Sequence, residues 1–426
     1  MTEDILHFVW IHNFNRVNGL FIDGSGEVEV ISPGDHNFDS GPDFFNAKIK
    51  VGDTIWAGNV EIHINASDWN KHGHNHNPQY DSVILHVVVK NDTQVFSSKG
   101  EVVPTVEIPY PDELEWKLHQ LIANETWIPC ANHIKNYGDL NLSMWLSALA
   151  VERLEQKTEQ VFKLVSEFKG GWEEAFYVSI SRSFGLKINA VPFEMLARAT
   201  PLKYLARAKD SILTLEAVLL GQAGMLDFKT DDADEYMLSL SKEYDYQQMK
   251  FGLSPIPGHL WKFLRLRPSS FPTLRIAQLA QLIHHSSGLF SKCMYSTSFD
   301  KLQDLLRSGC SHYWMTHYTF GKISPAKLKV LGDDTIRTIT LNTIIPFMFA
   351  YGSSRANQGL KDRAVTFLES LKPEKNSIID GFAKLGISAE SAFSSQALLQ
   401  LKGQYCDKRK CLYCKVGASV LLKKVD

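Results

Sequence analysis

At 426 residues, with 44% hydrophobic and 22% charged residues, the chain is long enough for two or three domains, and its composition excludes wholesale disorder. The first residues lack the basic stretch and apolar run of a signal peptide. No apolar segment is long enough to span a bilayer, and six cysteines are too few for a secreted disulfide framework. We therefore expect a cytoplasmic protein without membrane contact. The net charge of -2 hides an asymmetry, because residues 1–110 hold 15 acidic against 6 basic residues, which leaves 32 acidic and 39 basic residues in 111–426.

The first 110 residues are predicted to be mainly strands. Short runs of alternating or continuous apolar residues are separated by turn residues such as Asp23-Gly24 and Gly52-Asp53. The predicted strands cover residues 20–22, 28–31, 47–51, 55–64, 82–89 and about 102–108. Residues 65–81 are predicted to form a polar loop.

From about residue 112 the apolar spacing becomes helical. Helices are expected at 142–168, 172–185, 210–225, 233–250, 273–286, 299–308, 333–351, 359–371 and 390–404. The fold class predicted is α+β. A β-rich α/β domain with a mixed sheet spans residues 1–111, and a large all-α domain spans residues 112–426.

Acidic and imidazole side chains are concentrated around the predicted 47–64 hairpin. Asp43 stands at the start of one strand, and Glu61 and His63 lie on the same face of the next strand because strand side chains alternate. The hairpin should bring the two carboxylates together. Paired carboxylates beside an imidazole are typical of a site for Mg²⁺ or Mn²⁺, although Gly-Pro-Asp is also a common turn sequence.

At Pro42-Asp43 and Glu61-Ile62-His63 the chain resembles the PD-(D/E)XK nuclease superfamily. The resemblance implies a restriction-endonuclease-like fold in which Asp43 and Glu61 hold the metal and His63 stands where that superfamily has a lysine. Either His63 takes over that role, or Lys48 or Lys71 reaches the site, or the domain is not catalytic. The whole sequence also resembles an uncharacterised bacterial protein family of unknown function, marked by the strings GPDF, VEIH, SDW-x-x-H-x-H and HVV.

Histidines supply a second possible metal site. His72, His74 and His76 occur at every second position after Asp68, a pattern that fits Zn²⁺ ligation or a mobile loop over a substrate. His86 lies within an apolar strand, where a satisfied core histidine is the commoner role.

Three cysteines cluster near the C-terminus. Cys406, Cys411 and Cys414 have the spacing of a zinc or iron–sulfur cluster site, with the fourth ligand left open among Cys130, Cys293, Cys310 and a histidine such as His312. The alternative is three reduced thiols on a basic segment.

These patterns favour a metal-dependent, nuclease-like phosphodiesterase that acts on nucleic acid, with Asp43, Glu61 and His63 as catalytic residues. One alternative is a non-enzymatic nucleic-acid-binding or scaffold protein with a degenerate nuclease core. Another is a Zn²⁺-dependent hydrolase built on the histidine segment. Basic residues among aromatic ones at 261–275 fit a nucleic-acid contact or, more simply, the solvated face of a helix.

Overall fold

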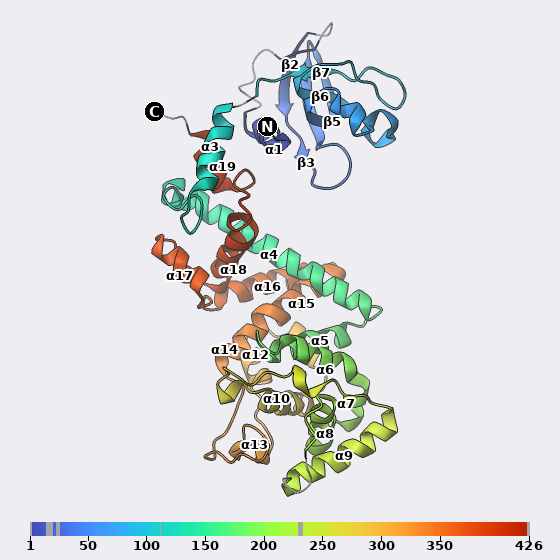
Figure 1. The fold of residues 1–426 in the computed structure, drawn as a ribbon, viewed down its shortest axis with the longest axis vertical. Helices are drawn as coiled ribbons and strands as arrows, with labels where there is room; N and C mark the ends of the chain where they lie inside the picture. Colours follow the sequence, from blue (N-terminus) through green and yellow to red (C-terminus); the bar gives the residue numbers. More distant parts are fainter. Residues whose placement is uncertain (1, 14–19, 23–25, 111, 229–232, 424–426) are drawn as a thin grey trace. The chain divides into compact units, whose positions relative to one another are not determined.

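The structure, a computed structural model, describes residues 2–13, 20–22, 26–110, 112–228 and 233–423. These residues form two compact units. The first consists of Met1–Trp145 together with Leu401–Asp426, and the second is Leu146–Gln400. The predicted α+β composition is confirmed, since one unit contains a mixed sheet and helices make up most of the rest (Figure 1).

The first unit is built on one sheet in the order β1-β2-β4-β5-β6-β7, with β3 paired to the first two residues of β4. Pairing is antiparallel from β1 to β5 and parallel from β5 through β6 to β7. The strands are β1 (Leu20–Ile22), β2 (Gly26–Ser32), β3 (Asp35–His36), β4 (Phe44–Val51), β5 (Thr54–Asn65), β6 (Val83–Lys90) and β7 (Thr105–Glu107). The predicted strands therefore coincide with observed ones, including the β4–β5 hairpin.

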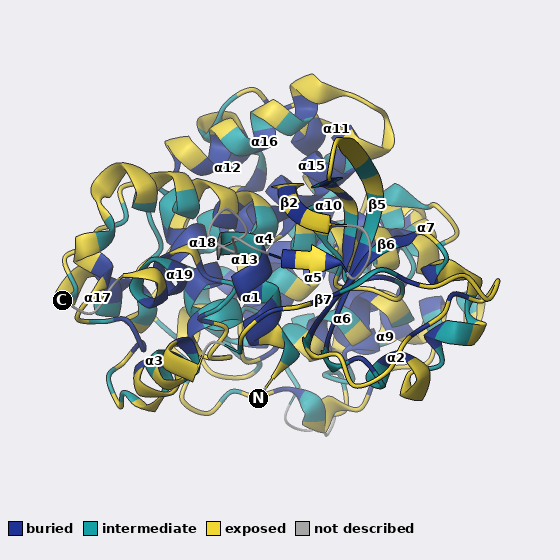
Figure 2. Ribbon diagram, turned by 90° about the horizontal axis from the view of Figure 1, so that it is seen from above, coloured by how far each residue is buried: buried dark blue, intermediate teal, exposed yellow. Residues whose placement is uncertain are grey.

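Alternation of side chains explains how the sheet is covered. In β2, exposed and buried residues alternate, as Figure 2 shows. One face of the sheet contributes Val60, Ile62 and Leu85 to a core that also contains Leu6 and Trp10 of helix α1 (Glu3–Asn13). The sequence did not predict α1, because its nearly continuous apolar residues lack a clear helical period.

The segment after β5 is packed rather than loop-like, so the prediction of a polar loop at 65–81 was wrong. It forms α2 (Asp68–Lys71) and two 3-10 turns, η2 (His74–His76) and η3 (Pro78–Tyr80). Trp69 and Tyr80 are buried there in a second small core with Val83 and Val88. These apolar side chains hold the histidines of the segment in fixed positions.

The first unit also contains elements beyond the boundary predicted at residue 111. They are α3 (Asp112–Ala123), η4 (Ile134–Tyr137), the first turns of α4 (Asp139–Glu167), the π-helical turn η9 (Leu401–Cys406) and α19 (Lys415–Leu422). Helix α19 packs against α3 and η4. The hydroxyl of Tyr413 donates a hydrogen bond of 2.6 Å to Asp4 in α1. The C-terminal segment thus belongs with the sheet.

The second unit is helical and has its own large apolar core. Besides most of α4, it contains α5 (Trp172–Phe184), α6 (Ala190–Ala199), α7 (Leu202–Ala208), α8 (Ile212–Gln222), α9 (Glu235–Phe251), α10 (Pro272–His285), α11 (Leu289–Met294), α12 (Phe299–Leu306), α13 (His312–Thr316), α14 (Asp333–Ile339), α15 (Ile345–Ser354), α16 (Gln358–Ser370), α17 (Ser377–Lys384) and α18 (Ala392–Gln400). Short 3-10 turns occur at η6 (Gly258–Leu260) and η7 (Pro268–Ser270), and a π-helical turn, η8 (Thr340–Ile344), joins α14 to α15. All nine predicted helices coincide with observed ones.

The basic and aromatic stretch at 261–275 lies partly in the interior of this unit. Trp261 and Arg275 are buried, and Arg275 donates hydrogen bonds to Thr335 and Gln278, so these two residues are part of the core. Among the helices that the structure describes, none is long and apolar enough to cross a lipid bilayer.

Candidate metal centre

The β4–β5 hairpin brings Asp43 and Glu61 together, as the sequence predicts. Phe44 pairs with Val60 across the hairpin, so the preceding Asp43 faces Glu61. The backbone N–H of Asp43 donates to Oε2 of Glu61 at 3.0 Å, and the N–H of Ile62 donates to Oδ2 of Asp43 at 2.9 Å. These reciprocal bonds fix both carboxyl groups at one end of the hairpin.

A β-bulge next to Asp43 helps to orient the Asp43 side chain. The register of β4 shifts between Phe44 and Ala47, where Asn46 has a φ of 59°. Such a bulge bends the strand and redirects neighbouring side chains. The side-chain carbonyl of Asn59 accepts from the N–H of Asn46 at 3.3 Å and so holds the bulge.

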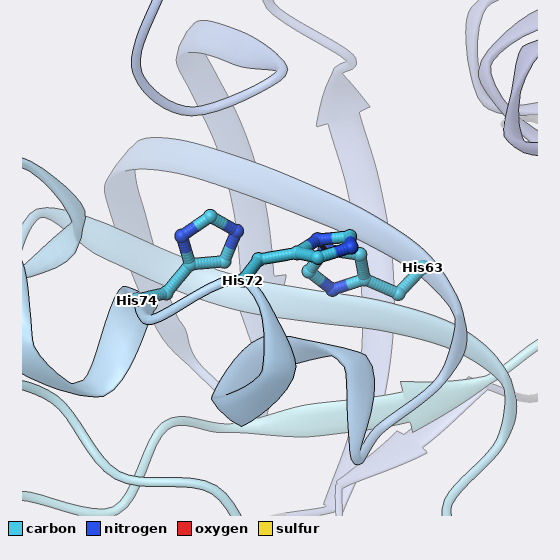
Figure 3. Close-up of side chains that lie close together, drawn as sticks. All are labelled: His63, His72 and His74. Carbon is cyan, nitrogen blue, oxygen red and sulfur yellow. Dashed lines mark hydrogen bonds between the residues drawn. The ribbon is translucent and has the colours of Figure 1, made fainter.

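Three histidines gather beside Glu61. Nε2 of His63 lies 3.1 Å from Nδ1 of His72. Oε1 of Glu61 lies 3.2 Å from Nε2 of His74 and 3.6 Å from Nε2 of His63. Figure 3 shows the three imidazoles close together, His63 from the strand and the other two from the following segment. In the described part of the chain, they form the one group of three or more metal-binding side chains whose ligand atoms all lie within 4.8 Å of one another.

The three imidazoles can converge on one metal ion, because in the described residues His63, His72 and His74 each offer a ligand atom within 4.8 Å of the others. An ion bonded tetrahedrally at about 2.0–2.1 Å holds neighbouring ligand atoms roughly 3.3–3.4 Å apart. Nε2 of His63 and Nδ1 of His72 lie 3.1 Å apart, close to that value. Glu61 contacts His63 and His74 but lies outside the group of three. Three imidazoles suit zinc better than magnesium, which prefers oxygen ligands.

Burial keeps His63, His74 and His86 neutral. Burial, followed by the charges of neighbouring imidazoles, lowers the pKa of His63 to about 4 and that of His86 to about 3. Burial also lowers the pKa of His74. Neutral imidazole is the form that binds metal, so the site is prepared for an ion at neutral pH. His72 is exposed and gives the group a side open to solvent.

The pKa values of the two carboxyl groups shift in opposite directions. Burial and the charge of Asp43 raise the pKa of Glu61. Burial also opposes ionisation of Asp43, but the contact with His7 and the hydrogen bond from Ile62 outweigh it and lower the Asp43 pKa. Two adjacent buried carboxylates repel each other, and a bound cation would let both ionise.

Sequence reasoning missed His7. Its Nε2 lies 3.3 Å from Oδ2 of Asp43, and the neighbouring carboxylate raises its pKa despite burial. His7 comes from α1, which was not predicted. The sequence feature that could have located His7 is its place between Leu6 and Phe8, in a segment whose acidic first turn is typical of the start of a helix.

His86 supports the group from behind. Its Nε2 lies 2.9 Å from Nδ1 of His63, and its own Nδ1 has no hydrogen-bond partner among the residues described. If His63 binds metal through Nε2, its Nδ1 carries the proton and donates to His86. A partner of this kind fixes the tautomer and orientation of a metal ligand. His86 is fully buried against Trp69, at 5.2 Å between ring centroids.

Other predicted candidates lie elsewhere. His76 is exposed, and its ring nitrogen Nε2 lies 3.3 Å from the side-chain amide of Asn75 rather than next to the histidine group. Lys71 pairs with Asp68 at 2.6 Å, and Lys48 is exposed. Among the described contacts, neither lysine reaches Asp43 or Glu61.

The three C-terminal cysteines also belong to the first unit. Cys406, Cys411 and Cys414 are buried and free of disulfide bonds. Cys406 ends η9, and Cys414 directly precedes α19. They form a cluster separate from the histidine group.

Comparison with known proteins gives a family but no activity. Residues 3–377 match a family described as a protein of unknown function, DUF2851, which confirms the expectation of an uncharacterised family. The match ends before the C-terminal cysteines. No curated protein and no solved structure matches the chain.

Proposed function

We propose that this chain, which belongs to the DUF2851 family of proteins of unknown function, is a metal-dependent hydrolase acting on phosphodiester bonds of nucleic acid. The observation that carries the proposal is the convergence of His63, His72 and His74 within reach of one ion, with Glu61 in contact with two of them. Three imidazoles favour zinc. The centre combines the carboxylate predicted for a nuclease with the histidines predicted for a zinc hydrolase.

The surrounding residues have distinct roles in this proposal. A bound ion would lower the pKa of a water ligand and offset negative charge on a phosphodiester. Asp43 holds its oxygen beside Glu61 and His7, where it can orient a water or extend the ligand set. His86 positions His63, and exposed His72 lies on the side that a substrate can approach.

The substrate class is supported by the placement of the motif residues. Asp43 at the start of β4 and Glu61-x-His63 on β5 lie on one antiparallel hairpin, as in the PD-(D/E)XK nucleases that this segment resembles. A magnesium or manganese ion held by Asp43 and Glu61 is the arrangement that the resemblance implies. Histidine ligation distinguishes the present proposal from it.

The experiment is a cleavage assay with the full chain. Labelled single- and double-stranded DNA and RNA are incubated with EDTA-treated protein after addition of Zn²⁺, Mn²⁺ or Mg²⁺. We expect cleavage with Zn²⁺. His72→Ala and Glu61→Gln should each lower the rate by roughly 100-fold or more, because the first removes a ligand and the second removes the carboxylate that contacts His63 and His74. His76→Ala is the matched control, since it removes an exposed imidazole of the same segment and should retain activity.

Two further variants separate the alternatives. His63→Lys restores the residue of the nuclease superfamily but removes a ligand, so it should abolish zinc binding. Activity that survives in His63→Lys and His72→Ala with Mg²⁺, yet is lost in Asp43→Asn, would replace the histidine centre by a two-carboxylate magnesium site. Tight metal and nucleic-acid binding without any cleavage would favour a non-enzymatic binding protein.

A further inference from the structure

Four buried cysteines lie in the first unit, although one of them is far from the others in sequence. Cys130 lies in the turn between α3 and η4, where its carbonyl accepts from the N–H groups of His133 and Ile134 at 2.9 Å. Cys414 directly precedes α19, which packs against both α3 and η4. The packing of these helices therefore brings the turn that contains Cys130 to the segment that contains the other three cysteines.

We propose that Cys130, Cys406, Cys411 and Cys414 together bind a metal centre through four thiolates, with Cys130 as the fourth ligand. Sequence spacing alone left that ligand open among three cysteines and a histidine. Cys293 and Cys310 belong to the second unit. The centre is independent of the proposed hydrolase site.

The backbone around the cluster is folded tightly about the thiols. The N–H of Arg409 donates to the carbonyl of Cys406, and the N–H of Cys414 donates to that of Cys411. A Cβ atom on Gly417 would come within 2.2 Å of the carbonyl oxygen of Cys411. Helix α19 therefore approaches the Cys411 turn as closely as a glycine permits.

A buried hydrogen-bond donor lies next to the cysteine segment without a partner. Nε1 of Trp145 is buried and has no hydrogen-bond partner within the described part of the chain. The Trp145 ring packs against that of Tyr405, which directly precedes Cys406, at 5.5 Å between centroids. N–H donors to sulfur are a regular feature around metal-bound cysteines, so this indole N–H is placed to serve such a ligand.

Burial of the four thiols also fits a bound cation. All four cysteines are buried. Thiols in a buried place need a metal ion to become thiolates, because the ion offsets both burial and mutual repulsion.

The spacing of the sulfurs favours an iron–sulfur cluster over a single zinc ion. A zinc ion bonded to four sulfurs at about 2.3 Å holds them roughly 3.8 Å apart. No three of these four cysteines, all of which the structure describes, have sulfurs within 4.8 Å of one another. A polynuclear cluster separates its ligand sulfurs more widely than one ion does.

The position of the cluster suggests what it does. Cys130 belongs to the turn that follows α3, and the other three cysteines flank Tyr413, whose hydroxyl binds Asp4 of α1. The metal centre would therefore fasten the C-terminal segment to the N-terminal helices. A role in stability, rather than in the chemistry of the histidine centre, follows from this arrangement.

The experiment measures metal in the full chain, purified anaerobically and carrying His72→Ala so that the histidine centre contributes no metal. We expect about four iron and four sulfide per chain, with visible absorption that dithionite bleaches. About one zinc without that absorption would support the four-thiolate site but replace the cluster by an ion. Cys130→Ser should retain roughly tenfold less metal after dialysis against chelator. Cys293→Ser is the matched control, because it alters an equally buried thiol of the other unit.

Alkylation mapped by mass spectrometry covers the case in which Cys130→Ser does not fold. In the protein with native cysteines, removal of the metal should expose Cys130 to alkylation together with the three C-terminal thiols. Alkylation of Cys130 that is independent of metal would overturn the proposal. Undiminished metal in folded Cys130→Ser, or less than about a tenth of an equivalent of iron and zinc after reconstitution, would overturn it as well.

Discussion

Glu216 in helix α8 shows how one buried carboxyl group couples stability to pH. Its side chain is fully buried, and Oε2 accepts from the hydroxyls of Tyr236 at 2.6 Å and Ser311 at 3.0 Å. Oε1 has no hydrogen-bond partner among the described residues. Burial raises the pKa to about 7, although these hydrogen bonds oppose the rise. The folded protein therefore keeps a proton on Glu216 at pH values where the unfolded chain has released it.

The sign of the pH dependence follows directly. Between about pH 4.5 and 7 the folded state binds more protons at this residue, so the free energy of unfolding falls as pH rises, by roughly 3 kcal/mol in total. Glu216→Gln cannot ionise and should lose this part of the slope. Urea unfolding at pH 4.5, 6 and 8 measures it, with Glu159→Gln at an exposed position of α4 as control. Parallel pH profiles for the native protein and Glu216→Gln would contradict the prediction.

At the scale of elements, local pattern predicted most of the fold and long-range packing explains what it missed. Helical periodicity located α4, α5 and α10, and alternation located the β4–β5 hairpin with Asp43 opposite Glu61. Helix α1 and its His7 were missed because a buried helix is apolar on nearly all sides. The 65–81 segment looked like a loop because its polar residues outnumber the few apolar anchors.

The candidate sites also depend on long-range packing that local sequence patterns do not reveal. Spacing could pair Glu61 with His63, but nothing local indicated that His72 and His74 would turn back to them while His76 would not. That selection depends on the turns η2 and η3 and on the burial of Trp69. Cys130 could be named only as one possible ligand, because no spacing rule relates residues so far apart.

Trp69 should therefore control both the packing of its segment and the metal site. It is fully buried, its Nε1 donates to the carbonyl of Phe96 at 2.9 Å, and its ring lies 5.3 Å from that of His74. Trp69→Ala should lower the free energy of unfolding of the first unit by roughly 3–5 kcal/mol. Metal affinity should fall by about 10–100-fold, as for other residues that orient ligands.

Denaturant unfolding and zinc titration of the full chain measure these two effects. Trp116→Ala provides the control, because Trp116 of α3 is 59% exposed and its removal should cost less than about 0.5 kcal/mol. Full zinc affinity in a destabilised Trp69→Ala protein would show that the histidines are positioned without the Trp69 ring.

At the scale of the whole molecule, the chain leaves the first unit at Trp145 and returns to it at Leu401. The sequence suggests a break at residue 111, where the apolar period changes from strand to helix. A change in period marks a change of element, whereas a unit boundary depends on which residues share a core. The core of the helical unit is made entirely of residues between 146 and 400.

Fragments of the chain should therefore follow the observed units. Leu146–Gln400 should fold by itself and unfold in one cooperative helical transition, because it keeps its complete core. Residues 1–145 alone lack α19 and three of the four proposed thiolate ligands, so they should bind no metal at that site. Joining 1–145 to 401–426 through a short Gly/Ser linker should restore binding, since the rings of Trp145 and Tyr405 lie only 5.5 Å apart. Circular dichroism and metal analysis test each fragment. Folding of 1–111 with a cooperative transition and a stability matching the joined fragment would show that α3 and the C-terminal segment add nothing to the sheet.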